Sequence, residues 1–270
     1  MRYIILTICV LLFNGGLYSQ TDNVSLSFGG GLNSLAYELD CCEKKSSDFG
    51  FSMKLGYEHF FNPKEGISTG LMMCCFKTST SLNYLQTIDN AVDEDNNTYT
   101  HRTYFNGLKE TQKQTMLIIP AEFVYRFSLS GKIELWLSGG LFGGFALKSD
   151  FKTEKGNLET RRFYYKQNLE VYGDYPMHGL YTESDFSGKN SFKPVLGGIF
   201  EPNFLVRLNE KVDLKCGFYF LYSFTAQNKQ DFERLYDPDG KNYHGFLNSQ
   251  LIGKTHPMLT GFLLGINYTF

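Results

Sequence analysis

The chain ends in Gly261-Phe262-Leu263-Leu264-Gly265-Ile266-Asn267-Tyr268-Thr269-Phe270. Every second residue of this stretch, from Phe262 to Phe270, is bulky and apolar, whereas most of the residues between them are small or polar. A period of two places successive side chains on opposite faces of a β-strand. The stretch therefore predicts a terminal strand with one bulky face and one small face.

The same alternation recurs along the chain and predicts an all-β protein. The expected strands are eight segments, at residues 24–35, 49–57, 67–78, 117–127, 133–143, 192–208, 214–224 and 262–270. Each is long enough for the roughly 9–11 residues that a tilted strand needs to cross a bilayer.

The connections between these strands alternate between short and long. The short ones are residues 62–66, 128–132 and 209–211, and the long ones are residues 40–47, 81–112, 148–191 and 226–255. Such alternation gathers all the long loops at one end, as in outer-membrane barrels with short periplasmic turns and long extracellular loops. We therefore predict an eight-stranded antiparallel up-and-down transmembrane β-barrel.

The interior of an eight-stranded barrel is just wide enough for side chains to fill it. The small face of the strands therefore belongs inside, and the bulky face belongs against lipid. Nine charged residues, four basic and five acidic, fall on the small face by parity: Lys54, Glu58, Glu122, Arg126, Glu134, Glu201, Arg207, Asp213 and Lys215. Because unpaired charges inside a barrel are costly, we expect ion pairs that close the lumen on the short-turn side; scattered surface charge is the alternative.

Composition limits the class of protein. The chain has 270 residues, 42% hydrophobic and 16% aromatic, with a formal net charge of −2 and a mean hydropathy of −0.26. This is too apolar for disorder and too weakly basic to indicate a nucleic-acid partner. A helical membrane bundle needs several apolar segments of about 20 residues each, and the sequence does not contain them.

The N-terminus reads as an export signal. Arg2 precedes an apolar run over residues 3–13, a Gly pair follows, and Ser19 is a small residue at the expected cleavage point. We expect a signal peptide at residues 1–19 and a barrel domain at residues 20–270; a short buried helix is the alternative reading of the N-terminus.

The segment Leu117-Ile118-Ile119-Pro120-Ala121-Glu122-Phe123-Val124-Tyr125-Arg126-Phe127 resembles a strand of small porin-like outer-membrane barrels often labelled PorT-like. Residues 135–145, with their Gly pairs, are similar to the strand that follows it in that family. The chain departs from the family at Ile118, which replaces an acidic residue, and in the length of three loops. The resemblance implies a bacterial outer-membrane location, a role for Tyr268 and Phe270 as the signal read by the barrel assembly machinery, and no transferable catalytic residue.

No motif for catalysis, cofactor binding or metal binding stands out, so we expect a protein that is not an enzyme and has no cofactor. Cys41 or Cys42 could bridge to Cys74 or Cys75, or all could be free thiols. Aromatic residues crowd the loop at residues 148–191, and the set we single out is Phe163, Tyr164, Tyr165, Tyr172 and Tyr175. They form a surface for a partner or glycan, or they pack on one another as strand extensions.

The expected function is that of an outer-membrane protein with a closed polar lumen, which acts as a structural or surface-binding protein through its long loops. Its partners would be outer-membrane lipid, the assembly machinery and an extracellular ligand. A secretion-system accessory and a small-solute porin remain open as alternatives.

Overall fold

A computed structural model describes residues 21–39, 42–172, 180–182, 186–237 and 242–270. The expected signal peptide at residues 1–19, Cys41 and Tyr175 lie outside this part of the chain. The long strands are β1 (Thr21–Leu39), β3 (Phe49–Phe60), β4 (Glu65–Val92), β5 (Thr98–Ser128), β6 (Ile133–Tyr164), β10 (Val195–Arg207), β11 (Val212–Ser223) and β12 (Ile252–Thr269). The short elements are β2 (Cys42–Ser47), β7 (Leu169–Val171), β8 (Leu180–Thr182), β9 (Ser187–Lys189) and the 3₁₀ helix η1 (Phe246–Asn248). Among the described residues, no helix is long and apolar enough to cross a membrane.

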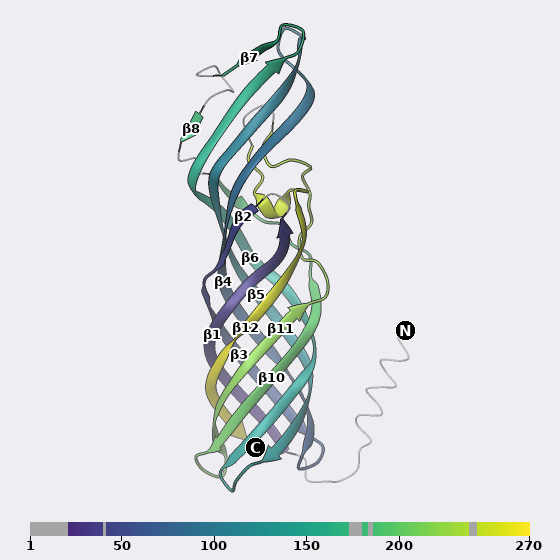
Figure 1. Cartoon of the computed structure of the whole chain (residues 1–270). Helices are drawn as coiled ribbons and strands as arrows, with labels where there is room; N and C mark the ends of the chain where they lie inside the picture. Colours follow the sequence, from purple (N-terminus) through teal and green to yellow (C-terminus); the bar gives the residue numbers. More distant parts are fainter. Residues whose placement is uncertain (1–20, 40–41, 173–179, 183–185, 238–241) are drawn as a thin grey trace, which may run out of the picture.

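The long strands pair in one antiparallel sheet whose path closes on itself (Figure 1). Its order is β10-β11-β12-β1-β3-β4-β5-β6, and β6 pairs back with β10 from Val195↔Gly144 to Val206↔Ile133. The prediction of an all-β antiparallel fold is confirmed. Along the closed part of this path every strand has a partner on both sides, so the backbone donors and acceptors there are used within the sheet.

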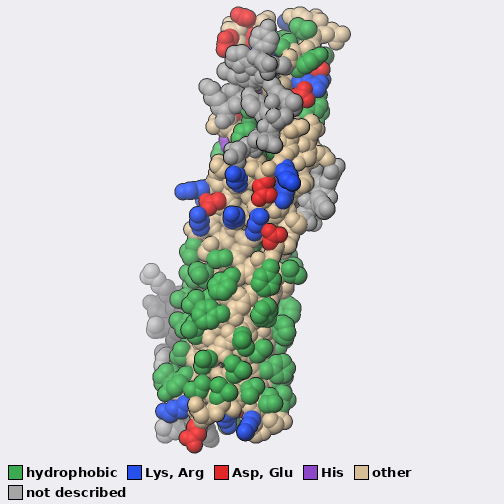
Figure 2. Space-filling view, turned by 90° about the vertical axis from the view of Figure 1, so that its left-hand side faces the viewer, with side chains coloured by type: hydrophobic (Ala, Val, Ile, Leu, Met, Phe, Trp, Pro, Cys, Tyr) green, Lys and Arg blue, Asp and Glu red, His purple; other side chains and the backbone are tan. Residues whose placement is uncertain are grey.

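Side chains alternate between the interior and the outer surface of this ring, as the period of two predicts. Strand β3 shows the pattern directly, since Phe49, Phe51 and Leu55 are exposed while Ser52 and Lys54 are buried. Phe218, Phe220 and Tyr222 on β11 are also 47–51% exposed. The bulky face therefore points outward. Figure 2 shows the resulting hydrophobic surface, a band on one face of the lower part of the molecule, with charged side chains above and below it.

Three strands are much longer than the sequence pattern predicts, and this corrects the expected loops. Residues 81–112 continue as β4 and β5, and the first part of residues 148–191 continues as β6. These extensions rise beyond the other strands in Figure 1. The prediction of a loop at residues 40–47 is also wrong in part, because residues 42–47 form β2, which pairs with β4 from Cys42↔Leu82 to Ser47↔Thr78.

Glycines allow the close approach of β1 and β12. A Cβ atom at Gly29 would lie 1.9 Å from the carbonyl oxygen of Phe262, and one at Gly31 would lie 1.9 Å from that of Thr260. No side chain fits at either position, so these two glycines permit the local packing of the strands.

Candidate functional site

The predicted interior charges form three groups, one above another along the ring. In the first group, the Lys54 ammonium on β3 lies 3.0 Å from the Glu122 carboxylate on β5 and 2.6 Å from the Glu201 carboxylate on β10. The three side chains are at most 3% exposed. Three strands far apart in sequence are thus joined through one buried cation with two carboxylates, so removal of that cation would leave two uncompensated buried charges.

The second group lies nearer the short turns. Lys215 on β11 makes an ion pair of 2.8 Å with Glu58 on β3. Ser25 on β1 donates to the same Glu58 oxygen and accepts from the Lys215 ammonium. The hydroxyl therefore adds a hydrogen bond to each member of a buried pair, which offsets part of its desolvation cost.

The third group lies at the mouth of the short-turn side. Arg126 and Arg207 lie 3.4 Å and 3.0 Å from the Glu134 carboxylate, and Arg207 is 4.0 Å from Asp213. The Arg126 guanidinium also stacks over the rings of Phe60 and Trp136, at 3.8 Å and 4.6 Å from their centroids. Arg207 is half exposed, so this group forms a rim and is less enclosed than the two groups above it.

Above the ion pairs, toward the long loops, the interior also contains a layer of large apolar side chains, which a wholly polar lumen would not have. The buried side chains there are large, and they include Met72, Met116, Ile118, Phe142, Ile199, Leu221, Leu259 and Leu263. Between them and the ion pairs, Tyr219 shares a hydrogen bond of 2.8 Å with Ser52 and donates to Asn33. Parity counting identified the inward positions, and it already placed Ile118 and Phe142 on the same face as Glu122 and Glu134.

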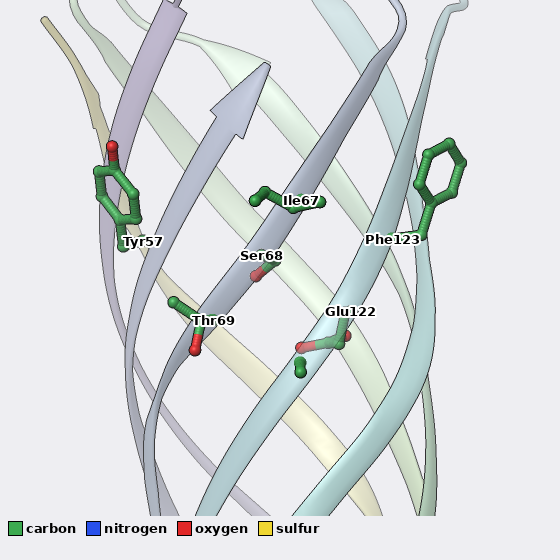
Figure 3. A pocket seen from close by; sticks show the side chains of 7 residues that line it. Tyr57, Ile67, Ser68, Thr69, Glu122 and Phe123 are labelled. Carbon is green, nitrogen blue, oxygen red and sulfur yellow. The ribbon is translucent and has the colours of Figure 1, made fainter. Parts of the chain in front are cut away.

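A hollow on the outer face lies beside the Lys54 group (Figure 3). Tyr57, Ile67, Thr69 and Phe123 line it together with Ser68, Ala121 and Glu122. The Glu122 side chain is fully buried, although it contributes to this lining. The hollow is therefore an apolar depression in the outer surface and does not expose the carboxylate.

The last long connection, residues 226–251, packs against the extended strands through two buried polar side chains that the sequence analysis missed. The Gln86 amide on β4 accepts from the backbone N–H groups of Leu235 and Tyr236 and donates to the carbonyl of Tyr236. On β5, the Glu110 carboxylate accepts from the Tyr243 hydroxyl and from the backbone N–H of Phe246. Neither residue stands out in the sequence, because each is one polar residue among many in a polar stretch.

Burial raises the pKa of Glu110 to about 7, against the hydrogen bonds from Tyr243, Phe246 and Gln112, which lower it. A carboxyl group with such a pKa changes its charge near neutral pH. The contact between this connection and β5 therefore contains a titratable group.

Among the singled-out aromatic residues, Phe163 and Tyr164 lie on the extension of β6, Tyr165 lies in the turn after it and Tyr172 follows β7. Arg102 lies over the Phe163 ring at 4.6 Å, and Arg161 lies over the Tyr104 and Tyr172 rings at 4.7 Å and 5.6 Å. Tyr164 packs on Tyr99 and Tyr165 on Phe163, with ring centroids 5.6 Å and 4.8 Å apart. These contacts match the strand-extension alternative, yet Tyr165 and Tyr172 remain about two-thirds exposed, at 64% and 66%.

The C-terminal residues expected to form the assembly signal lie on the outer surface near the short turns. Tyr268 and Phe270 are 39% and 71% exposed, and their rings meet edge to face at 5.2 Å. The Phe270 backbone N–H donates to the carbonyl of Asp22, which ties the end of the chain to β1.

The described cysteines and His244 have well-defined surroundings. Cys74, Cys75 and Cys216 are free. No group of three or more His, Cys, Asp or Glu side chains in this part of the chain could hold a metal ion. The imidazole of His244 lies 3.0 Å from Asp237 and stacks on Phe232, and neither neighbour is a hydroxyl or thiol nucleophile.

Comparison with known proteins adds low-identity structural matches only. No family model and no curated protein matches the sequence. Solved structures that match include Neisserial surface protein A, at 10% identity and a TM-score of 0.32 over 93% of this chain and 97% of that chain. The outer membrane protein OprG from Pseudomonas aeruginosa matches at 10% identity and a TM-score of 0.39, over 93% and 95% of the two chains. The attachment invasion locus protein of Yersinia pestis matches at 11% identity and a TM-score of 0.31, over 92% and 98%.

Proposed function

We propose that the chain is an eight-stranded β-barrel of the bacterial outer membrane, with a closed interior, that acts as a structural or surface-binding protein through its long-loop end. The observation that carries this proposal is the direction of the bulky face. Phe51, Leu55, Phe123, Phe218 and Phe262 all lie on the outer surface and are 46–52% exposed. A ring of such side chains is costly in water and favourable in lipid.

The signal-like sequence at residues 1–19, the short turns on one side and the resemblance to PorT-like barrels support the outer membrane over other bilayers. In this arrangement the short turns face the periplasm, and the extensions of β4, β5 and β6 reach outside the cell. The exposed Tyr165 and Tyr172 then belong to the surface available to an extracellular partner. We assign the chain no catalytic activity and no cofactor.

A gel-shift experiment tests the barrel itself. Folded membrane barrels resist dodecyl sulfate until they are heated, so unheated, detergent-solubilised protein should migrate differently from boiled protein. The barrel would be contradicted if both samples migrated identically and the protein was also digested by trypsin in micelles and in vesicles.

Labelling of intact cells tests the orientation. Lys166 lies in the turn after β6 and Lys132 lies in the short turn before it, and both are exposed. A membrane-impermeant maleimide should modify a Lys166→Cys variant on intact cells and a Lys132→Cys variant only after permeabilisation, each measured against the parent protein. The reverse pattern would place the long loops in the periplasm.

A porin is the competing function, and the filled interior argues against it. Among the described residues, the ion pairs of Lys54 and the large apolar side chains lie inside the ring, where a channel would have to run. Planar bilayers that contain the protein should show no stable conductance steps, whereas reproducible large openings would favour solute transport.

A further inference from the structure

The outer surface changes from apolar to cationic at one level on three neighbouring strands. On β4, Met73 and Cys75 are followed outward by Lys77, and on β5 Leu117 and Thr115 are followed by Lys113. On β6, Phe145 and Leu147 are followed by Lys148. Figure 2 shows charged side chains gathered just above the hydrophobic band. This level is where lipid headgroups would lie, if the hydrophobic band spans the bilayer as proposed above.

Two of these lysines oppose each other directly. Lys77 and Lys113 are cross-strand partners in the pairing of β4 with β5. Like charges in this position destabilise an antiparallel pair. An anion between them would remove that cost, so the pairing points to a ligand of negative charge.

The carboxylates nearby neutralise this cluster only in part. Lys77 lies 3.6 Å from Asp48 and 3.7 Å from Glu154, and Lys148 lies 2.9 Å from Asp150. Glu154 is shared with Lys109, at 3.0 Å. In the part of the chain that the structure describes, Lys113 makes no ion pair of its own; Asp150 is its cross-strand partner on β6, but the Asp150 carboxylate pairs with Lys148.

A groove joins the lysines to the hydrophobic surface below. Lys77, Lys113 and Lys148 line it together with Phe49, Cys75, Phe76, Gln114, Thr115 and Asp150. Phe49 is the apolar side chain of this lining that is most exposed, at 66%. A ligand that fits has a negatively charged head beside the lysines and a hydrocarbon chain that runs down past Phe49.

We propose that this groove binds the phosphate headgroup of an anionic membrane lipid from the long-loop leaflet. Lys113 and Lys148 supply the charge that holds the phosphate, and Lys77 completes the site. The inference rests on the proposed function, because the groove meets headgroups only if the hydrophobic band lies in a bilayer.

Native mass spectrometry of the full chain released from detergent micelles tests the site. Dioleoyl phosphatidic acid, dioleoyl phosphatidylcholine and inorganic phosphate serve as separate probes. Phosphatidic acid should bind at least about tenfold more tightly than phosphatidylcholine, which corresponds to roughly 1.4 kcal/mol. Binding of inorganic phosphate as tight as that of phosphatidic acid would overturn the lipid assignment.

A Lys113→Gln, Lys148→Gln double variant should lose this preference for phosphatidic acid. The matched control is Lys166→Gln, which also removes a charge but lies at the far end of β6. Equal preference in the double variant and the parent would overturn the site. Heat-modifiable migration of the parent and of each variant separates the two proposals. A parent that folds as a barrel but shows no preference for phosphatidic acid refutes only this site. A parent that forms no folded barrel refutes the proposed function as well.

Discussion

At the scale of single residues, Lys54 is the side chain on which the interior depends most. It is the shared partner of Glu122 and Glu201, and all three are buried. The sequence identified these residues by parity alone, because a charged residue at an inward position must find a partner. It could not identify which charges pair, since Lys54, Glu122 and Glu201 come from strands that meet only when the ring closes.

A Lys54→Met variant should lose about 3–5 kcal/mol of unfolding free energy, the usual cost of leaving buried charge uncompensated. Urea-induced unfolding in micelles or vesicles measures this loss. A Lys54→Met, Glu122→Gln, Glu201→Gln variant should recover most of it, and Lys166→Met on the exposed turn should cost almost nothing. A Lys54→Met protein as stable as the parent would show that the three charges are not coupled as described.

Glu110 makes the attachment of residues 226–251 sensitive to pH. Its pKa is about 7 in the folded protein and 4.5 in the unfolded reference, so the attached state binds the proton more tightly. The contribution is therefore complete below pH 4.5 and is lost as the pH rises through 7, by at most roughly 3 kcal/mol. Hydrogen exchange of residues 235–237 and 242–246 should become faster between pH 5 and pH 8, after correction for the intrinsic rate.

A Glu110→Gln variant provides the control for that experiment. It removes the titrating group and keeps an acceptor for Tyr243 and Phe246. The neighbouring contact between His244 and Asp237 is unchanged in this variant. The same pH dependence in the variant and the parent would contradict the assignment to Glu110.

At the scale of elements, alternation predicts strands well where one face is lipid-like and fails where both faces are polar. Five of the eight segments with bulky alternates lie within long strands, and the other three extend past the ends of β10, β11 and β12 by one to three residues. Beyond them, residues such as Thr78, Thr80, Thr111 and Gln112 are polar and buried, so hydrophobicity has no period of two there. For this reason the extensions of β4, β5 and β6 were predicted as loops, and the roles of Gln86 and Glu110 were missed.

The outermost part of β6 depends on arginine–aromatic contacts and on Glu170 of β7. Arg161 contacts Glu159 and Glu170 and lies over Tyr104 and Tyr172. Arg161→Ala should release β7, with faster hydrogen exchange at Leu169–Val171 and no change in the ring. Glu170→Ala should have a smaller effect, below about 1 kcal/mol, because the ion pairs it removes are partly exposed. Faster exchange spread through β10 and β11 in either variant would contradict a local role.

At the scale of the whole molecule, the assignment as a membrane barrel depends on which face of the ring meets lipid. The outward side chains make a continuous hydrophobic band, and the inward ones fill the lumen with ion pairs and apolar groups. The sequence predicted this division because a bulky apolar face alternates with a face that is smaller and more polar. It did not predict the height of the molecule above the band, which comes from the extended strands.

Quenching of tryptophan fluorescence by brominated lipid tests whether the outer, bulky face of the ring meets lipid. Trp136 is the single tryptophan of the chain and is 2% exposed inside the ring, whereas Phe218 is 51% exposed at the middle of β11. In vesicles of lipid brominated on its acyl chains, a Phe218→Trp, Trp136→Phe variant should be quenched strongly, and the parent protein only weakly. Strong quenching of Trp136, with none at position 218, would mean that the bulky face does not meet lipid and would contradict the account.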